Sequence, residues 1–75
     1  MFPREIFAER VSSLRIAKGL SQPALANVFG VTKATISRIE SADRAVSVDL
    51  LCALADYFNV SLDYLTGRSD DPKRY

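Results

Sequence analysis

Residues 22–41 of this 75-residue chain have the sequence Gln22-Pro-Ala-Leu-Ala-Asn-Val-Phe-Gly-Val-Thr-Lys-Ala-Thr-Ile-Ser-Arg-Ile-Glu-Ser41. This segment has the pattern of two short helices joined by a tight turn. Helices that cross at roughly 90–120° need a small residue where they meet, and Ala26 supplies it. Gly30 stands where the turn needs a residue that adopts a positive φ. We therefore predict a helix-turn-helix, whose second helix is anchored from below by Leu25, Val31, Ile36 and Ile39.

The other face of that second helix carries short or basic side chains. Arg38 can form two parallel hydrogen bonds with guanine, and Lys33 can contact guanine or phosphate. The methyl groups of alanine and threonine can contact thymine. Because such groups fit the major groove of double-stranded DNA, we predict a DNA-reading face made of Thr32, Lys33, Ala34, Thr35, Ser37 and Arg38.

Apolar residues at helical spacing predict three further helices around the helix-turn-helix. The first spans about residues 3–18. Ser21 and Thr32 are the expected N-caps of the two helices of the motif. A fourth helix begins near Ser47, and a fifth of one to two turns follows its N-cap Ser61 and closes at Gly67.

These elements predict an all-α fold of five helices in a single domain. Helices this short are marginal alone in water, so they must pack around a shared core. No segment shows the sustained alternation that is typical of a strand. We assign residues 1–68 to a helix-turn-helix DNA-binding domain and residues 69–75 to a flexible C-terminal tail.

Charge is unevenly distributed, although the net charge is only +1. Residues 1–44 carry seven Lys and Arg against four Asp and Glu, whereas residues 45–75 carry three against five. The first part is therefore suited to face phosphates. The chain has no histidine and no Gly-rich phosphate loop, and its acidic residues are scattered. We expect no enzyme activity, no metal site and no cofactor.

The sequence also bears on location. Its single cysteine, Cys52, lies among apolar neighbours and fits a reducing compartment. No apolar run approaches the roughly 18 residues of a membrane span, and the first residues lack the pattern of a signal peptide. We expect a cytoplasmic protein that does not contact a membrane.

Several motifs occur together and in a fixed order along most of the chain. They are Arg10-Val11, Leu14-Arg15, Lys18-Gly-Leu-Ser-Gln-Pro-Ala-Leu-Ala26, Gly30-Val-Thr32, Thr35-Ile-Ser-Arg-Ile-Glu40 and Val60-Ser-Leu-Asp-Tyr-Leu-Thr-Gly67. With this set, residues 7–67 resemble the lambda-repressor-like helix-turn-helix proteins of the Cro/repressor type, also called the XRE family.

The resemblance implies five helices, of which the second and third read DNA. It implies that Gln22 touches a phosphate and steadies the start of the third helix, and that Lys33, Ala34 and Arg38 read bases. It also implies a largely buried ion pair between Arg15 and Glu40. One departure is the segment Ser41-Ala-Asp-Arg44, where the family usually has glycine and more basic residues, which leaves Arg44 as the main cationic contact of that loop.

Proteins of this kind typically bind palindromic operators as two-fold dimers. We therefore expect a transcriptional regulator that represses by occupying an operator. For a homodimer, the candidate contacts are at the fifth helix and the end of the fourth: Tyr57, Tyr64 and Leu65. The alternatives are an antitoxin with a toxin partner, a controller of a restriction–modification operon, and a protein-interaction module that has lost DNA binding.

Overall fold

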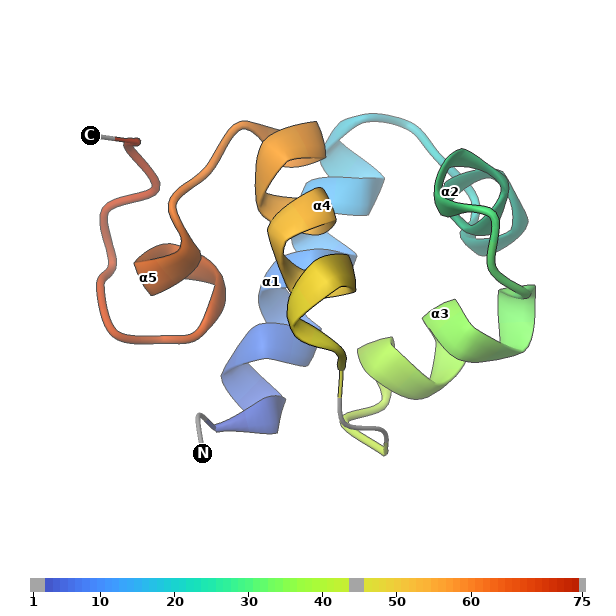
Figure 1. The fold of residues 1–75 in the computed structure, drawn as a ribbon, viewed down its shortest axis with the longest axis horizontal. Helices are drawn as coiled ribbons and strands as arrows, with labels where there is room; N and C mark the ends of the chain where they lie inside the picture. Colours follow the sequence, from blue (N-terminus) through green and yellow to red (C-terminus); the bar gives the residue numbers. More distant parts are fainter. Residues whose placement is uncertain (1–2, 44–45, 75) are drawn as a thin grey trace.

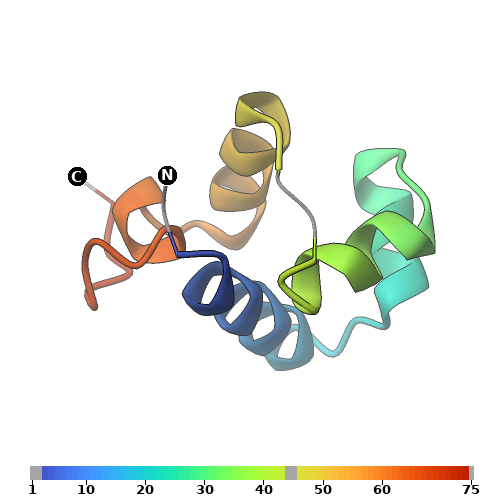
Figure 2. The same ribbon diagram turned by 90° about the horizontal axis from the view of Figure 1, so that it is seen from below.

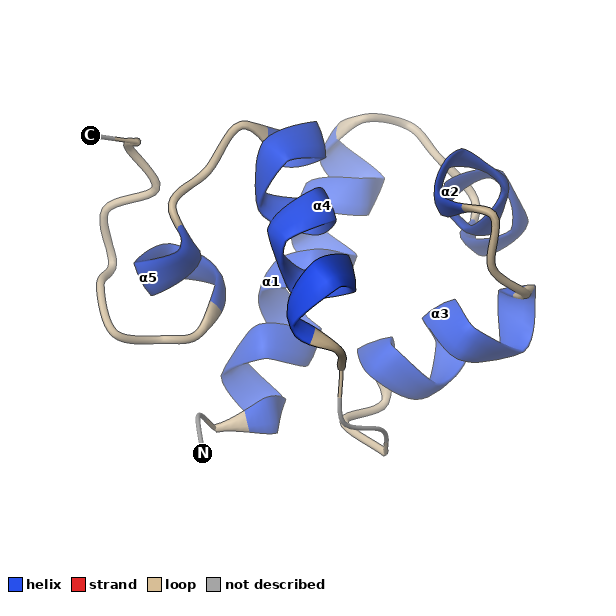
Figure 3. Cartoon of the chain, viewed as in Figure 1, coloured by secondary structure: helices blue, strands red, loops and turns tan. Residues whose placement is uncertain are grey.

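Figure 1 shows how the helices are arranged in the computed structural model, which describes residues 3–43 and 46–74. Within these residues the chain forms five helices and no strand (Figure 3). The predicted all-α fold is therefore confirmed. The helices are α1 (Arg4–Ala17), α2 (Gln22–Phe29), α3 (Lys33–Glu40), α4 (Val48–Phe58) and α5 (Leu62–Leu65).

Hydroxyl side chains begin the four helices after α1. Each accepts a hydrogen bond from the backbone N–H three residues later, at 3.0–3.2 Å, and the four residues are Ser21, Thr32, Ser47 and Ser61. A helix start leaves its first N–H groups without partners inside the helix, so each hydroxyl satisfies one of them. These are the four starting points that the sequence predicts.

The two ends of the molecule are formed by different helices. α1 and α4 occupy the middle, α2 and α3 lie together at one end, and α5 lies at the opposite end (Figure 1). The perpendicular view shows the same separation (Figure 2). α3 packs on both α2 and α1, while α5 packs on α1 and α4. The helix-turn-helix is therefore held on the body mainly through the contact between α3 and α1.

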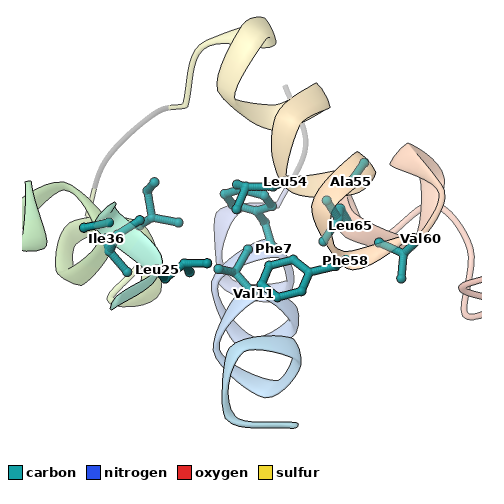
Figure 4. Close-up of a cluster of buried hydrophobic side chains, with 11 residues drawn as sticks. Phe7, Val11, Leu25, Ile36, Leu54, Ala55, Phe58, Val60 and Leu65 are labelled. Carbon is teal, nitrogen blue, oxygen red and sulfur yellow. The ribbon is translucent and has the colours of Figure 1, made fainter. Parts of the chain in front are cut away.

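One apolar core connects all five helices. Phe7 and Val11 of α1 lie between the side chains of α2 and α3 on one side and those of α4 and α5 on the other (Figure 4). Leu25, Ile36 and Leu54 are 0% exposed. Full burial of a side chain of this size contributes about 1.5–3 kcal/mol. The core is small, so these few residues carry most of the hydrophobic stabilisation.

The segment after α5 lies against the helices. The backbone N–H of Ser61 donates to the carbonyl of Pro72 at 3.0 Å. Arg10 donates to the Ser69 carbonyl at 2.7 Å and to the Asp70 carboxylate at 2.8 Å, and Arg74 donates to Asp56 at 2.7 Å. These contacts connect residues 69–74 to α1 and α4. The segment that we predicted as a tail after residue 68 thus makes hydrogen bonds with the helical domain.

The turn after α3 contains a strained position. Ala42 has a φ of 63°, a left-handed conformation that costs an L residue roughly 1–2 kcal/mol. Its backbone N–H donates to the Ile39 carbonyl at 3.2 Å, and that of Asp43 donates to the Arg38 carbonyl at 2.9 Å. These two bonds close the end of α3. Both hydrogen bonds require a left-handed conformation at position 42, and the residue there is alanine.

Replacing Ala42 with glycine should stabilise the domain by up to about 1 kcal/mol, because glycine adopts a positive φ without steric cost. Thermal unfolding followed by circular dichroism should show a melting temperature higher by up to about 4–8 °C. The matched control is Ala17→Gly, at an exposed position in the last turn of α1, which should lower the melting temperature. A decrease in both variants would contradict the strain at Ala42.

Candidate nucleic-acid interface

The turn between α2 and α3 has the geometry that the sequence predicts. Gly30 ends α2 with a φ of 66°, and the backbone N–H of Val31 donates to the Ala26 carbonyl at 3.0 Å. Ala26 is only 2% exposed, and a larger side chain would separate the two helices. α3 then begins directly after Thr32. The two helices therefore form a compact helix-turn-helix.

Helix α3 has two opposite faces. At about 100° per residue, Ile36 and Ile39 share one face, and they are 0% and 1% exposed. The opposite face carries the predicted DNA contacts. Lys33, Ala34 and Arg38 are exposed there, and Ser37 is half-buried. The structure therefore brings together four of the predicted contact residues on one outward surface, which we call the α3 face: Lys33, Ala34, Ser37 and Arg38.

The two threonines of the motif have a structural task. The Thr32 hydroxyl accepts a hydrogen bond from the backbone N–H of Thr35 at 3.2 Å, and the two hydroxyl groups lie 3.1 Å apart. Thr32 is exposed and Thr35 is half-buried at the side of the α3 face. Together they fix the start of α3. The predicted contact at Arg44 falls outside the described residues.

A buried polar cluster connects three helices behind the α3 face. Arg15 of α1 donates from Nε and from a terminal nitrogen to the two carboxylate oxygens of Glu40 on α3, at 2.7 and 3.0 Å. Glu40 also accepts from Nε2 of Gln22 on α2, at 3.2 Å. The side chains of Arg15 and Glu40 are 14% and 6% exposed. The ion pair that the resemblance implies is thus present and nearly shielded from water.

The cluster also reaches the chain between α1 and α2. Arg15 donates a further hydrogen bond to the carbonyl of Leu20, at 2.6 Å. The hydrogen bond to Glu40 raises the pKa of Arg15 above its ordinary value, and the opposing effect of burial is smaller. Arg15 therefore stays charged at every physiological pH. It fixes the carboxylate of Glu40 and the entrance to α2 at the same time.

The predicted dimer contacts have partners within the chain. The guanidinium of Arg10 lies 4.2 Å from the centre of the Tyr64 ring, and the ammonium of Lys18 lies 4.7 Å from that of Tyr57. Both tyrosines are half-buried. Leu65 is 0% exposed, so it offers no surface to a second copy in this conformation. The predicted interface therefore depends on Tyr57 and Tyr64.

Two features that the described residues lack concern membranes and metals. No helix in residues 3–43 and 46–74 is long and apolar enough to cross a membrane. Over the same residues, no three histidine, cysteine, aspartate or glutamate side chains are grouped so that they could hold a metal ion.

A family model described as helix-turn-helix matches residues 11–65. The chain belongs to this helix-turn-helix family. The match covers the helix-turn-helix and most of the rest of the fold, so the resemblance to the XRE-type proteins is confirmed. A solved structure, the restriction-modification controller protein C.AhdI from Aeromonas hydrophila, is 32% identical with a TM-score of 0.73, covering 83% of this chain and 90% of that one.

Similar proteins of the family are regulators by name. The control protein C.SmaI of Serratia marcescens is 37% identical over 65 residues, which are 87% of this chain and 77% of that protein. The uncharacterized HTH-type transcriptional regulator YobD of Bacillus subtilis is 33% identical over 67 residues, 89% of this chain. The chain spans 60% of YobD, and about half or less of two other regulators that it matches.

Two functional features were missed by reasoning from the sequence. One is the hydrogen bond from Gln22 to Glu40, which joins residues 18 positions apart. The other is Arg10, which holds the Tyr64 carbonyl and the segment after α5. Arg10 does belong to one of the motifs that carry the family resemblance, Arg10-Val11. Its partners lie 54 to 60 residues away, and no local pattern indicates them.

Replacing Glu40 with alanine should lower the free energy of unfolding by about 3–5 kcal/mol, because Arg15 would remain charged, buried and without its partner. Urea unfolding followed by circular dichroism measures the change. The double variant Arg15→Met/Glu40→Leu should lose much less, since no charge is left alone.

The matched control for this loss is Asp56→Ala. It removes the acidic partner of Arg74 from a pair whose side chains are 42% and 68% exposed, and such a pair contributes about 1 kcal/mol or less. Equal stability losses in Asp56→Ala and Glu40→Ala would show that the burial of the Arg15–Glu40 pair has no energetic consequence.

Proposed function

We propose that this protein binds double-stranded DNA through the α3 face and represses transcription by occupying an operator in the cytoplasm. The observation that carries the proposal is the exposure of Lys33 and Arg38 on a helix whose opposite side is fully buried. Among the described residues neither cation has an ion-pair partner. Membership of the helix-turn-helix family supports the same function.

The mechanism begins with electrostatic attraction. Lys and Arg side chains displace counterions from the phosphates, and this supplies most of the affinity for any sequence. α3 then enters the major groove, where Arg38 and Lys33 reach base edges and the methyl of Ala34 meets thymine. Gln22, at the first position of α2, contacts a phosphate in this proposal. Phosphate contacts set the orientation, and base contacts select the site.

Repression follows from occupancy. A protein bound to promoter DNA blocks the polymerase sterically, so repression of this kind requires no catalytic step. A homodimer on a palindromic operator would double the contacts and place two α3 helices about 34 Å apart, one turn of DNA. The second copy would lie against Tyr57 and Tyr64, at the half-exposed aromatic surface.

A second candidate is control of a restriction–modification system. It is favoured by the extent of the matches, which cover 77% of C.SmaI and 90% of the C.AhdI chain but only 60% of YobD. An antitoxin that binds a toxin partner belongs to the same class of DNA-binding regulators. A protein-interaction module without DNA binding belongs to another class, and a binding measurement separates it from the rest.

Replacing Arg38 with alanine should weaken binding to a duplex selected from random sequences by about 1–3 kcal/mol and relax the preference at one base position. Fluorescence anisotropy at two salt concentrations measures the dissociation constants. Wild-type affinity should fall steeply with added salt, because phosphate contacts dominate binding.

The matched control for the charge is Arg68→Ala. Arg68 is exposed and follows α5, at the end of the molecule opposite α3, so its removal should leave the affinity nearly unchanged. Equal losses in the two variants would show that the α3 face is not the reading surface. The absence of any salt-dependent binding would leave the interaction module as the function.

Sedimentation analysis on a palindromic site should show two protomers per duplex at saturation. Tyr57→Ala and Tyr64→Ala should each reduce the cooperativity of binding, because aromatic side chains provide much of the energy of small interfaces. Phe29 contacts Tyr57 with the ring centres 5.5 Å apart, so the folded state of each variant is checked by its melting temperature. A single protomer per palindrome at saturation would refute the dimer.

A further inference from the structure

The Gln22 side chain has only one orientation that suits its neighbour. Its Nε2 lies 3.2 Å from Oε1 of Glu40. A carboxylate only accepts hydrogen bonds, so it must face the nitrogen of the amide and not the oxygen. Glu40 on α3 therefore determines the direction of the Gln22 amide on α2. A glutamine on an open helix surface would have no such preference.

The carboxylate of Glu40 is itself held by hydrogen bonds. Arg15 contacts both of its oxygens, at 2.7 and 3.0 Å, in the paired geometry that matches a guanidinium to a carboxylate. The same guanidinium is held by the Leu20 carbonyl, at 2.6 Å. The Glu40 side chain is only 6% exposed. The carboxylate that accepts from the Gln22 amide is therefore held by Arg15 of α1 and is largely shielded from solvent.

The amide nitrogen carries two hydrogens, and Glu40 uses one. A phosphate oxygen is likewise only an acceptor, so a phosphate contact needs the other hydrogen of the same nitrogen. We propose that Glu40 is a positioning residue, which holds the Gln22 amide with its free N–H directed to a DNA phosphate. This inference rests on the proposed DNA binding. Glu40 touches no DNA in it and acts through Gln22.

The negative charge of Glu40 affects DNA affinity in the opposite direction to its positioning of Gln22. A carboxylate near the DNA repels phosphates, so its neutralisation alone would strengthen binding. Loss of a fixed amide would weaken it, since an unfixed side chain must lose rotamer freedom when it binds. The direction of the change in Glu40→Gln therefore distinguishes the two roles. Glutamine keeps the shape of the side chain but presents either a donor or an acceptor to Gln22.

The test is a double-mutant cycle on a duplex of random sequence, which reports phosphate contacts without knowledge of the operator. Wild type, Gln22→Ala, Glu40→Gln and the double variant are compared by fluorescence anisotropy, at a temperature where circular dichroism shows all four folded. We expect Glu40→Gln to weaken binding about threefold or more in the wild-type background. In the Gln22→Ala background the same change should have no weakening effect. The salt slope of Gln22→Ala should match wild type, because a neutral amide displaces no counterion.

A second measurement needs no DNA and no stable variant. Nitrogen-15 relaxation of the Gln22 side chain in the free wild-type protein should give an order parameter above about 0.6 for the amide, the limit below which groups count as flexible. A lower value would overturn the positioning role, whatever the variants do. In a folded Glu40→Gln variant the order parameter should decrease.

The outcomes separate this inference from the proposed function. A wild-type protein that binds no duplex even at low salt overturns both. Salt-dependent wild-type binding, combined with equal effects of Glu40→Gln in the two backgrounds, overturns only the positioning role. A structural role of Glu40, acting through Arg15 alone, predicts this second result, because it does not depend on the residue at position 22.

Discussion

The position of the helix-turn-helix on its body depends on the carboxylate of Glu40. This group lies on α3 and accepts hydrogen bonds from Arg15 on α1 and Gln22 on α2. Apolar contacts between short helices are non-directional, so they allow small shifts at little cost. A paired guanidinium and carboxylate allow almost none. The pair therefore contributes a defined orientation of α3, and its net contribution to stability is secondary.

The shortness of α2 and α3 makes the constraint from the Arg15–Glu40 pair necessary. α2 and α3 have eight residues each, well below the length at which an isolated helix is stable in water. Their shape and direction are therefore set by capping residues and by packing. The buried side of α3 consists of Ile36 and Ile39, and its outer side is left for other molecules. A single eight-residue helix thus serves both the core and the proposed recognition surface.

The sequence predicted the parts of this structure that depend on local chemistry. The starts of α2 and α3 follow from the hydroxyls of Ser21 and Thr32, which need a partner only three residues away. The Arg15–Glu40 pair was expected because of the family resemblance. The contacts of Arg10 with the segment after α5 were not expected, because they depend on how distant parts meet. Leu65 was assigned to a dimer surface but is 0% exposed, because a helix of four residues gives too short a pattern to separate an inner face from an outer one.

The α3 face lies at one end, while α5 and the segment after it lie at the other (Figure 1). The uneven charge is a property of the sequence and not of the two ends, because Arg4, Arg10 and Arg15 belong to α1 in the middle of the molecule. Tyr64 belongs to α5, whereas Tyr57 of α4 contacts Phe29 of α2 with the ring centres 5.5 Å apart, so a substitution at Tyr57 also changes the packing of the helix-turn-helix.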